Sequence, residues 1–386
     1  MARRTVNVAL IGSKFMGRTH SHAYSNVARY FDLPIEPVRH TIAARHADEL
    51  EPFAARWGWA NWTTDWQQAV TDDAIELVDV GTPNDVHREQ AIAALDAGKH
   101  VACEKPLAGT LDDARQMKDA AAKVQGRQHT FVWYNYRRCP AVALAHRFVR
   151  QGRLGRIRHV RAAYLQSWGE SDAPLVWRFR GDIAGSGAHG DLNAHIIDMA
   201  RFITGEQITE VTGAIEETFI KERELPDGGG KGKVGVDDAV LFLARLSGGA
   251  VASFEATRFS TGDKNRNRIE VHGEKGAVRF NFERMNELEW YDATLDAPQQ
   301  GWSTINVTSM DAGHPYAEAY WPAGGHVIGY VDTFTNMAAD ICKVLAGDEP
   351  VAPLPDFADA YETQKVLHAA IVAARERGPV QVGEVG

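Results

Sequence analysis

The sequence predicts an α/β protein of two domains, and three observations lead to this prediction. The chain has 386 residues, enough for two hydrophobic cores. As far as about residue 134, short apolar runs alternate with helical patterns, which is typical of a doubly wound parallel sheet. Beyond it, strands that alternate polar and apolar residues follow one another through glycine turns, which indicates an open, mostly antiparallel sheet. We therefore expect domains over 1–134 and 135–386, with a C-terminal helix that is able to pack back on the first domain.

The first apolar run, Val6 to Ile11, ends in the turn Gly12-Ser13-Lys14-Phe15-Met16-Gly17, and a helical pattern follows. A strand, a glycine turn and a helix N-terminus together hold a dinucleotide pyrophosphate through backbone N–H groups and the helix dipole. Lys14 takes the place of the middle glycine of G-x-G-x-x-G, so its side chain must point away from the phosphate or contact it as a cation. Phe15 and Met16 line the nicotinamide side of the turn or pack in the core. We predict a Rossmann dinucleotide site here.

The end of the second strand bears on which dinucleotide binds. In a dinucleotide fold, an acidic residue there usually binds the adenosine ribose 2′-hydroxyl. This strand ends Ala44-Arg45-His46, and Arg45 could pair with a 2′-phosphate, which favours NADP at this position. We nevertheless expect NAD as the cofactor, and Arg45 keeps NADP open as the alternative. A more literal glycine motif, Gly185 to Gly190, follows no buried strand and is rejected.

Two further buried strands, Ile75 to Val80 and Val101 to Cys103, each end in a polar motif. Because ligands bind at the carboxyl ends of parallel strands, we expect both motifs in the cofactor crevice. Their residues are Thr82, Pro83, Asn84 and His87 after the first strand, and Glu104 and Lys105, followed by Pro106, after the second. Capping of the following helix is the competing interpretation for Asn84 and His87.

A third polar motif opens a predicted helix in the middle of the chain, within residues 187–198. Asp191, His195 and Asp198 stand at i, i+4 and i+7, on one face of an α-helix. A carboxylate one turn from an imidazole fixes its tautomer and raises its basicity, as a general acid/base histidine requires. With His189, this group is also a candidate metal site. We expect no metal, because no cysteine or further histidine cluster supports one.

These motifs, in this order, resemble those of the Gfo/Idh/MocA oxidoreductase family over nearly the whole chain. The resemblance rests chiefly on Glu104-Lys105-Pro106 and on Asp191-x-x-x-His195. The turn from Ser13 to Gly17, Trp177-Arg178 and Trp321-Pro322 are similar to the levoglucosan dehydrogenase branch of that family. The family implies a Rossmann domain, a second domain whose open sheet often mediates dimers or tetramers, and hydride transfer between NAD or NADP and a hydroxyl of a sugar or cyclitol.

The hypothesis that follows is a dehydrogenase that oxidises a secondary hydroxyl of a pyranose or anhydrosugar. The hydroxyl proton leaves to His195, Lys105 stabilises the alkoxide or shares the proton, and Asp191 orients His195 or binds a neighbouring hydroxyl. The remaining substrate candidates are polar or aromatic and follow strands or lie in loops: Asn135, Tyr136, Arg137, Gln166, Trp168, Trp177, Arg178 and His326. Of these, Trp168 and Trp177 could instead be core residues or subunit contacts.

Three alternatives stay open: an inositol or cyclitol dehydrogenase, an NADPH-dependent keto-sugar reductase, and a dinucleotide sensor without catalysis. The composition disfavours some classes of binding partner. Forty-two basic against fifty-one acidic residues leave a net charge of −9, which disfavours nucleic acid. No apolar run approaches the roughly 20 residues that span a bilayer. Three scattered cysteines indicate a reducing compartment, so we expect a cytoplasmic protein. The family resemblance implies in addition a homodimer or homotetramer.

Overall fold

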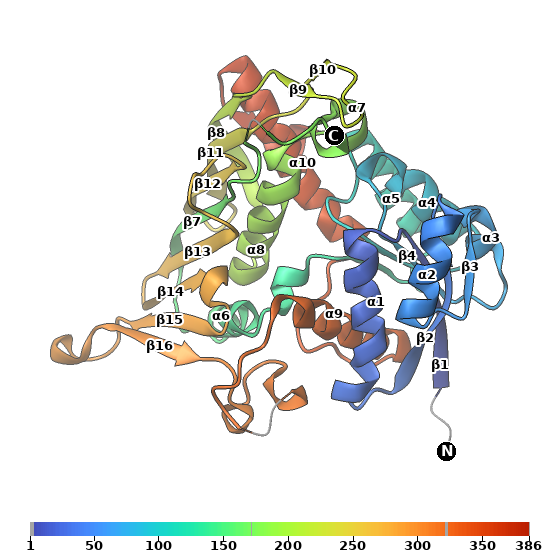
Figure 1. Ribbon diagram of the computed structural model, residues 1–386. Coiled ribbons are helices and arrows are strands. Elements are labelled where there is room, and N and C mark those ends of the chain that lie inside the picture. The colour runs from blue at the N-terminus through green and yellow to red at the C-terminus, as the bar shows by residue number, and fades with distance from the viewer. Residues whose placement is uncertain (1–3, 171, 321–322, 386) are drawn as a thin grey trace. The chain divides into compact units, whose positions relative to one another are not determined.

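The computed structural model describes residues 4–170, 172–320 and 323–385, which form two compact units (Figure 1). The first unit comprises Met1–Ala108, Asp112–Arg138 and Ile328–Tyr361; the second comprises Gly109–Leu111, Cys139–Val327 and Glu362–Gly386. The chain therefore returns to the first unit after it has built most of the second. No helix among the described residues combines the length and the apolar character that a membrane crossing requires.

The first unit contains a parallel six-stranded sheet in the order β3-β2-β1-β4-β5-β6. This is the strand order of a doubly wound dinucleotide fold, and the order reverses between β1 and β4. The predicted fold of the N-terminal region is confirmed, although β3 was not expected as a strand. The bounds are β1 Arg4–Ile11, β2 Ile35–Ala43, β3 Asn61–Thr63, β4 Leu77–Val80, β5 His100–Cys103 and β6 Thr130–Val132.

Helices surround this sheet, and the last of them comes from far along the chain. Their bounds are α1 Phe15–Tyr30, α2 Ala47–Trp57, α3 Trp66–Thr71, α4 His87–Asp96, α5 Leu111–Lys123 and α9 Tyr330–Ala346. Helix α9 packs against α1 and β2. It supplies Phe334 and Met337 to the same core as Tyr24 and Val27 of α1. The core of the first unit is therefore incomplete without residues 328–361.

The second unit is built on an open nine-stranded sheet in the order β16-β15-β14-β13-β7-β12-β11-β8-β17. Strands β7 and β12 run parallel, and the other neighbouring pairs are antiparallel, as predicted. The bounds are β7 Ile157–Leu165, β8 Ile208–Glu217, β11 Ala239–Leu246, β12 Val251–Thr257, β13 Arg266–Gly273, β14 Gly276–Asn281, β15 Glu287–Asp292, β16 Trp302–Asn306 and β17 Val380–Gln381.

One face of this sheet is covered and the other is open. Helices α6 (Pro140–Arg150) and α8 (Ala194–Thr204) pack against β7, β13, β14 and β15. In β11 the side chains of Val240 and Phe242 are buried, whereas Leu241 and Leu243 on the opposite face are exposed. This alternation is the period-2 pattern from which the sheet was predicted. The long helix α10, Phe357–Glu376, begins in the first unit and continues in the second.

Two further segments of the second unit contain short strands. Within the glycine-rich segment 226–235, β10, Lys231–Lys233, pairs with β9, Glu222–Glu224. Within the segment 297–326, β16 extends the large sheet beside β15. Both strands are short, with five residues at most, so the alternation in them is too brief to recognise.

The predicted central helix begins differently from a regular α-helix. Residues His189–Asn193 form a π-helix that continues into α8. A π-helix bonds i to i+5, so the spacing argument from 3.6 residues per turn does not hold between Asp191 and His195. The carboxylate of Asp237 accepts hydrogen bonds from the backbone N–H of Gly187 (2.7 Å) and of His189 (2.8 Å). A residue 50 positions along the chain from Gly187 therefore caps the helix that carries His195.

We expect Gly187→Ala to destabilise this helix start. A Cβ at Gly187 would lie 1.7 Å from the backbone oxygen of Asp237, so the backbone must move and both bonds to the Asp237 carboxylate weaken. The free energy of unfolding should fall by about 3 kcal/mol in a denaturant titration. Gly301→Ala is the matched control, because nothing lies within 4 Å of a Cβ there. Equal stability of the two variants would contradict the prediction.

Candidate functional site

The glycine turn after β1 is shaped by close backbone approaches. Gly12 has φ +117°, and a Cβ there would lie 2.5 Å from the carbonyl oxygen of Gly81, at the end of β4. A Cβ at Gly17 would lie 2.3 Å from the Gly12 oxygen. Helix α1 starts with no side chain capping its N–H groups. The turn at the reversal of strand order therefore fits a pyrophosphate, which accepts hydrogen bonds from such groups.

The predicted cofactor side chains in and near this turn are exposed, except for that of Met16. Lys14 has φ −82°, which any residue adopts, and its ammonium pairs with Glu49 of α2. Phe15 is 60% exposed and stacks on Tyr330 at 6.5 Å between ring centroids, so it is not a core residue. Met16 is half-buried at the edge of the core. Arg45, just after β2, is exposed.

The turn after β4 is held from within by His87. Its buried ring lies with Nε2 2.9 Å from the Thr82 carbonyl oxygen and Nδ1 3.2 Å from that of Pro106. Burial lowers the pKa of His87, so the ring is neutral at neutral pH. The N-cap positions of the 3-10 turn Asn84–Val86 and of α4 are occupied by Pro83 and Val86, and not by Asn84 or His87. His87 instead fastens the Thr82–Asn84 turn to the segment that follows β5.

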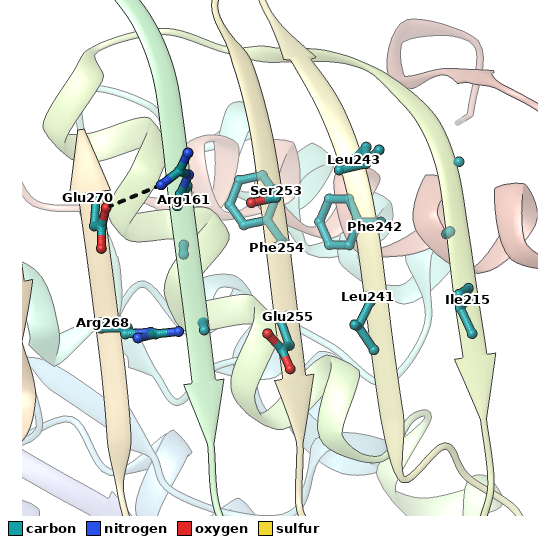
Figure 2. Close-up of a pocket in the computed structure, with 14 residues that line it drawn as sticks. Arg161, Ile215, Leu241, Phe242, Leu243, Ser253, Phe254, Glu255, Arg268 and Glu270 are labelled. Atoms are coloured by element: carbon teal, nitrogen blue, oxygen red, sulfur yellow. Dashed lines mark ion pairs between the residues drawn. The ribbon is translucent and has the colours of Figure 1, made fainter. Parts of the chain in front are cut away.

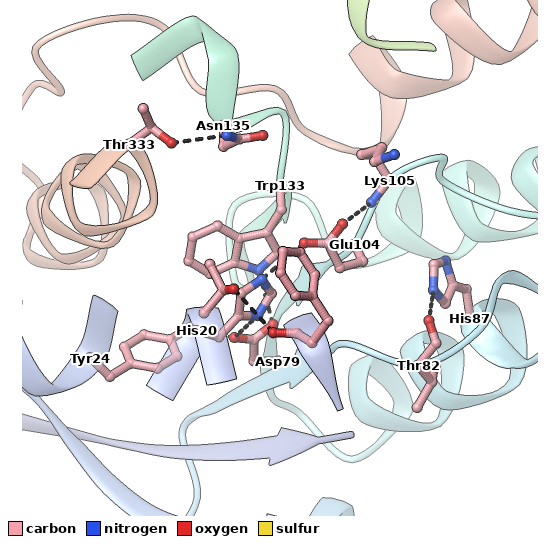
Figure 3. A network of polar contacts seen from close by, with 12 residues as sticks. His20, Tyr24, Asp79, Thr82, His87, Glu104, Lys105, Trp133, Asn135 and Thr333 are labelled. Atoms are coloured by element: carbon pink, nitrogen blue, oxygen red, sulfur yellow. Dashed lines mark hydrogen bonds and ion pairs between the residues drawn. The ribbon is translucent and has the colours of Figure 1, made fainter. Parts of the chain in front are cut away.

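A buried polar network lies behind these strand ends (Figure 3). His20 of α1 places Nδ1 2.9 Å from Asp79 of β4 and Nε2 2.9 Å from Glu104, just after β5. Asp79 also accepts hydrogen bonds from the Tyr24 hydroxyl and from Nε1 of Trp133, each at 2.9 Å. The indole of Trp133 stacks on His20 with 4.2 Å between ring centroids. One imidazole therefore bridges two buried carboxylates.

The charge of His20 follows from these contacts. Burial by itself lowers the pKa of His20, but the charges and hydrogen bonds of Asp79 and Glu104 outweigh it and raise the pKa to about 9. The ring is therefore an imidazolium at neutral pH and donates both N–H groups. Because the folded pKa lies above the unfolded value of 6.5, the network stabilises the fold fully below pH 6.5 and loses that contribution as the pH rises through about 9.

Glu104 connects this network to Lys105. One carboxylate oxygen of Glu104 faces His20, and the other accepts the backbone N–H of Lys105 at 3.0 Å. Lys105 is half-buried, and the Lys105–Pro106 peptide is cis. The predicted residues Asn135, Tyr136 and Arg137 also belong to the first unit and are buried. There, Asn135 donates to Thr333 (2.9 Å), and Arg137 pairs with Asp359 (2.5 Å).

In the second unit, Asp191 lies in the π-helix that precedes His195. Its carboxylate accepts a hydrogen bond at 3.0 Å from Arg258, which follows β12 and is 1% exposed. The Arg258 guanidinium lies 4.7 Å from the centre of the Trp168 ring, and it donates to the carbonyl oxygen of Arg178 at 3.3 Å. Arg258 thus joins three predicted site residues, although sequence reasoning did not single it out.

A second chain of hydrogen-bonded side chains lies around the C-terminal end of β7. Tyr164 and Gln166 both donate to Oδ1 of Asn265, at 2.6 and 2.7 Å, and Trp168 donates to Gln166 at 2.7 Å. The Tyr164 ring lies 5.8 Å from that of His195. Trp168 is 38% exposed, so it is not a core residue. The predicted residues Gln166, Trp168, Asp191 and His195 therefore gather at one end of the sheet.

The remaining predicted residues of the second unit are Trp177, Arg178 and His326. Trp177 is half-buried beside a small apolar cluster, and the Arg178 guanidinium lies 4.4 Å from its ring centre. His326 is exposed, with Nδ1 2.8 Å from the Ala323 carbonyl oxygen. The motif Trp321-Pro322 lies outside the described residues.

His189, the additional ligand of the metal alternative, is engaged within the fold. Its Nε2 donates to the carbonyl oxygen of Leu367 at 2.7 Å, and its Nδ1 accepts from Asn193 at 2.9 Å. Burial lowers the pKa of His189, in agreement with a neutral ring that uses both nitrogens. Within the described ranges, no three His, Cys, Asp or Glu side chains are placed to hold a metal ion.

Several contributors escaped the sequence analysis: His20, Asp79, Trp133, Asp237, Arg258 and Asn265. A signal existed for Asp79, which is the charged residue of the otherwise apolar strand Leu77–Val80. A buried charge requires a partner, so Asp79 could have been singled out, but its partners lie 54 to 59 positions away. The other residues carry no local pattern that sets them apart.

Comparison with known proteins agrees with this arrangement. The model "Oxidoreductase family, NAD-binding Rossmann fold" matches residues 6–132, and the model "GFO/IDH/MocA C-terminal domain" matches residues 142–279. Levoglucosan dehydrogenase of Pseudarthrobacter phenanthrenivorans is 40% identical over 396 aligned residues, covering 99% of each chain.

Solved structures are similar over the same length. An oxidoreductase domain protein from Kribbella flavida superposes with a TM-score of 0.94 at 46% identity, covering 98% of this chain and 99% of the other. A levoglucosan dehydrogenase in complex with NADH and levoglucosan has a TM-score of 0.92 at 40% identity, with coverage of 98% and 99%. Together with the matched domain models, these similarities show that the chain belongs to the Gfo/Idh/MocA family of NAD-binding oxidoreductases.

Proposed function

We propose that this oxidoreductase oxidises a secondary hydroxyl of a pyranose or anhydrosugar of the levoglucosan kind to a keto sugar. The observation that carries the proposal is the polar end of the large sheet, where His195 and Asp191 lie with Gln166 and an accessible Trp168. A sugar offers many hydroxyls and one apolar face, and such a group of polar side chains beside an aromatic ring suits both. The whole-length similarity to levoglucosan dehydrogenase supports the same substrate class.

The cofactor that fits this chain is NAD, which accepts the hydride when bound. We assign its pyrophosphate to the turn from Gly12 to Gly17, with Lys14 and Phe15 at the surface of that turn. Met16, Arg45, Thr82, Pro83, Asn84, Glu104 and Lys105 complete the proposed cofactor-binding set, and His87 supports it from within. The similar levoglucosan dehydrogenase structure contains NADH, which favours NAD over the NADP that Arg45 suggested.

The chain's own residues handle the proton. We assign to His195 the acceptance of the hydroxyl proton, and to Lys105 the stabilisation of the negative charge that develops on that oxygen. Asp191, whose carboxylate is held by Arg258, then binds a neighbouring hydroxyl. A carboxylate held by a buried guanidinium is fixed before the substrate arrives, so less entropy is lost on binding.

The open sheet face supports an oligomer of this chain (Figure 2). Ile215, Leu241 and Leu243 project from β8 and β11, and all three are exposed. Further across the same face, Arg161 of β7 and Glu270 of β13 form an ion pair at 3.9 Å. Side chains of this kind occur in subunit interfaces, so we propose that a second copy of the chain covers this face in a homodimer or homotetramer.

The three cysteines, Cys103, Cys139 and Cys342, are buried free thiols, which supports the proposal of a reducing, cytoplasmic compartment.

The alternatives of a cyclitol dehydrogenase, an NADPH-dependent keto-sugar reductase and a non-catalytic sensor predict different outcomes in one assay.

That assay follows absorbance of the reduced nicotinamide with NAD or NADP against levoglucosan, glucose, 1,5-anhydroglucitol, myo-inositol and scyllo-inositol. We expect turnover with NAD and an anhydrosugar or pyranose. Turnover with a cyclitol alone would favour the first alternative, and a requirement for NADP would favour the second. Tight NADH binding without turnover of any compound would indicate a sensor.

Lys105→Ala and His195→Ala should each lower kcat by roughly 100- to 10,000-fold, because each removes a group that handles charge or proton in the transition state. The dissociation constant for NADH, measured by fluorescence titration, should change far less. Lys123→Ala, on the exposed side of α5, is the matched control and should keep normal kcat. Near-normal turnover in both active-site variants would refute the assignment.

Leu243→Asp should disrupt the oligomer, because it places a carboxylate in the apolar part of the open sheet face. Sedimentation velocity should show a smaller species than the unaltered chain. Leu295→Asp makes the same chemical change at an exposed position outside that face, in the loop after β15, and should keep the original size. An unaltered chain that sediments as a monomer would remove the basis of the proposal.

A further inference from the structure

We propose that His20 is a positioning residue for Lys105, acting through Glu104. This inference rests on the proposed function, because it explains how the lysine that stabilises the developing alkoxide is held. His20 lies within α1, the helix that begins at the glycine turn, and Lys105 lies two residues after Cys103, the last residue of β5. The buried network thus joins the helix of the cofactor turn to the segment that carries the lysine.

Two successive hydrogen bonds make the connection (Figure 3). His20 Nε2 lies 2.9 Å from Oε1 of Glu104, and Oε2 of the same carboxylate accepts the backbone N–H of Lys105 at 3.0 Å. The side chain of His20 is fully buried, and that of Glu104 is 6% exposed. A carboxylate bonded at both oxygens has a fixed plane, so the position of Glu104 determines where the Lys105 backbone can make its bond.

His20 is itself held on every side. Its Nδ1 bonds to Asp79, and Asp79 is fixed by hydrogen bonds from Tyr24 and Trp133. The Trp133 ring stacks on the imidazole, and Phe334 of α9 lies 5.6 Å away between ring centroids. Rotation of the imidazole would break both carboxylate contacts, so the ring acts as a rigid support.

The charges explain why a neutral side chain would not serve equally well. Asp79 and Glu104 are buried carboxylates, and an isolated buried charge is strongly unfavourable. The imidazolium lies between them and donates to both. Without it, one oxygen of Glu104 loses its donor in the interior, and the carboxylate whose other oxygen accepts the Lys105 N–H is no longer held in place. Loss of His20 should therefore weaken the hydrogen bond of the Lys105 N–H, in addition to lowering the stability of the fold.

The test compares His20→Gln with Ser21→Ala. Ser21 is the next residue of the same helix, is equally buried, and accepts a hydrogen bond from Trp59 Nε1 at 2.9 Å outside the network. The first readout is hydrogen exchange of the Lys105 amide in the enzyme without substrate. We expect exchange about tenfold faster in His20→Gln, because the bond to Glu104 weakens, and unchanged exchange in Ser21→Ala.

The second readout is kinetic, with the sugar that the assay above identifies. His20→Gln should lower kcat by about 10- to 100-fold, as expected when a reacting group is misplaced. The dissociation constant for NADH should stay within about threefold. If His20 acts through Glu104, the double variant His20→Gln/Glu104→Gln should have the kcat of Glu104→Gln alone, whereas independent effects would multiply.

The outcomes separate this inference from the proposed function. Equal Lys105 exchange in His20→Gln and Ser21→Ala, or multiplied kinetic losses in the double variant, would overturn the positioning role. If the unaltered enzyme oxidises no sugar, the proposed function fails, and the exchange experiment still decides whether His20 positions Lys105. Should His20→Gln not fold, Asp79→Asn tests the same support, because it weakens the anchor of the imidazole and should raise the same amide exchange rate.

Discussion

Two carboxylates buried at the carboxyl ends of neighbouring parallel strands impose a constraint on the whole first unit. Buried carboxylates such as Asp79 and Glu104 require hydrogen-bond donors and a positive charge beside them, because an unpaired buried charge is strongly unfavourable. His20 supplies both, and burial, which by itself would lower its pKa, is outweighed by the two carboxylates, which raise the pKa to about 9. Helix α1 must therefore lie with this residue against β4 and β5. That placement also brings the start of α1 to the turn where a pyrophosphate fits.

The same constraint explains why a distant segment belongs to this unit. Trp133, beyond β6, donates to Asp79 and stacks on His20, and Phe334 of α9 lies against both rings. These aromatic side chains exclude water from the charges, and the hydrogen bonds inside are stronger for it. Residues 328–361 therefore cover the polar network with Phe334 and also contribute to the apolar core.

In the second unit, a buried arginine is the positively charged partner of a carboxylate. Arg258 is buried and bonds to Asp191, while Asp237 caps the π-helix that places Asp191 before His195. Both partners come from strands or strand ends of the sheet and not from the helix itself. The π-helix is the local departure from regular geometry, and such departures are frequent at functional sites. The polar end of the sheet is thus organised by contacts between residues that are far apart in the sequence.

The features that depend on local pattern could be predicted from the amino-acid sequence. Alternating periodicities predicted the doubly wound sheet and the open sheet; a motif at a strand end identified Lys105, and a motif at a helix start identified Asp191 and His195 as site candidates. The way in which these groups are supported depends on contacts that form in three dimensions. His20 and Arg258 have ordinary neighbours in sequence, and their partners lie 59 to 84 positions away. The π-helix also depends on a cap from Asp237, so no periodicity within residues 187–198 could reveal it. Periodicity records which face of an element is buried, whereas a buried charge is paired by whatever the fold brings beside it.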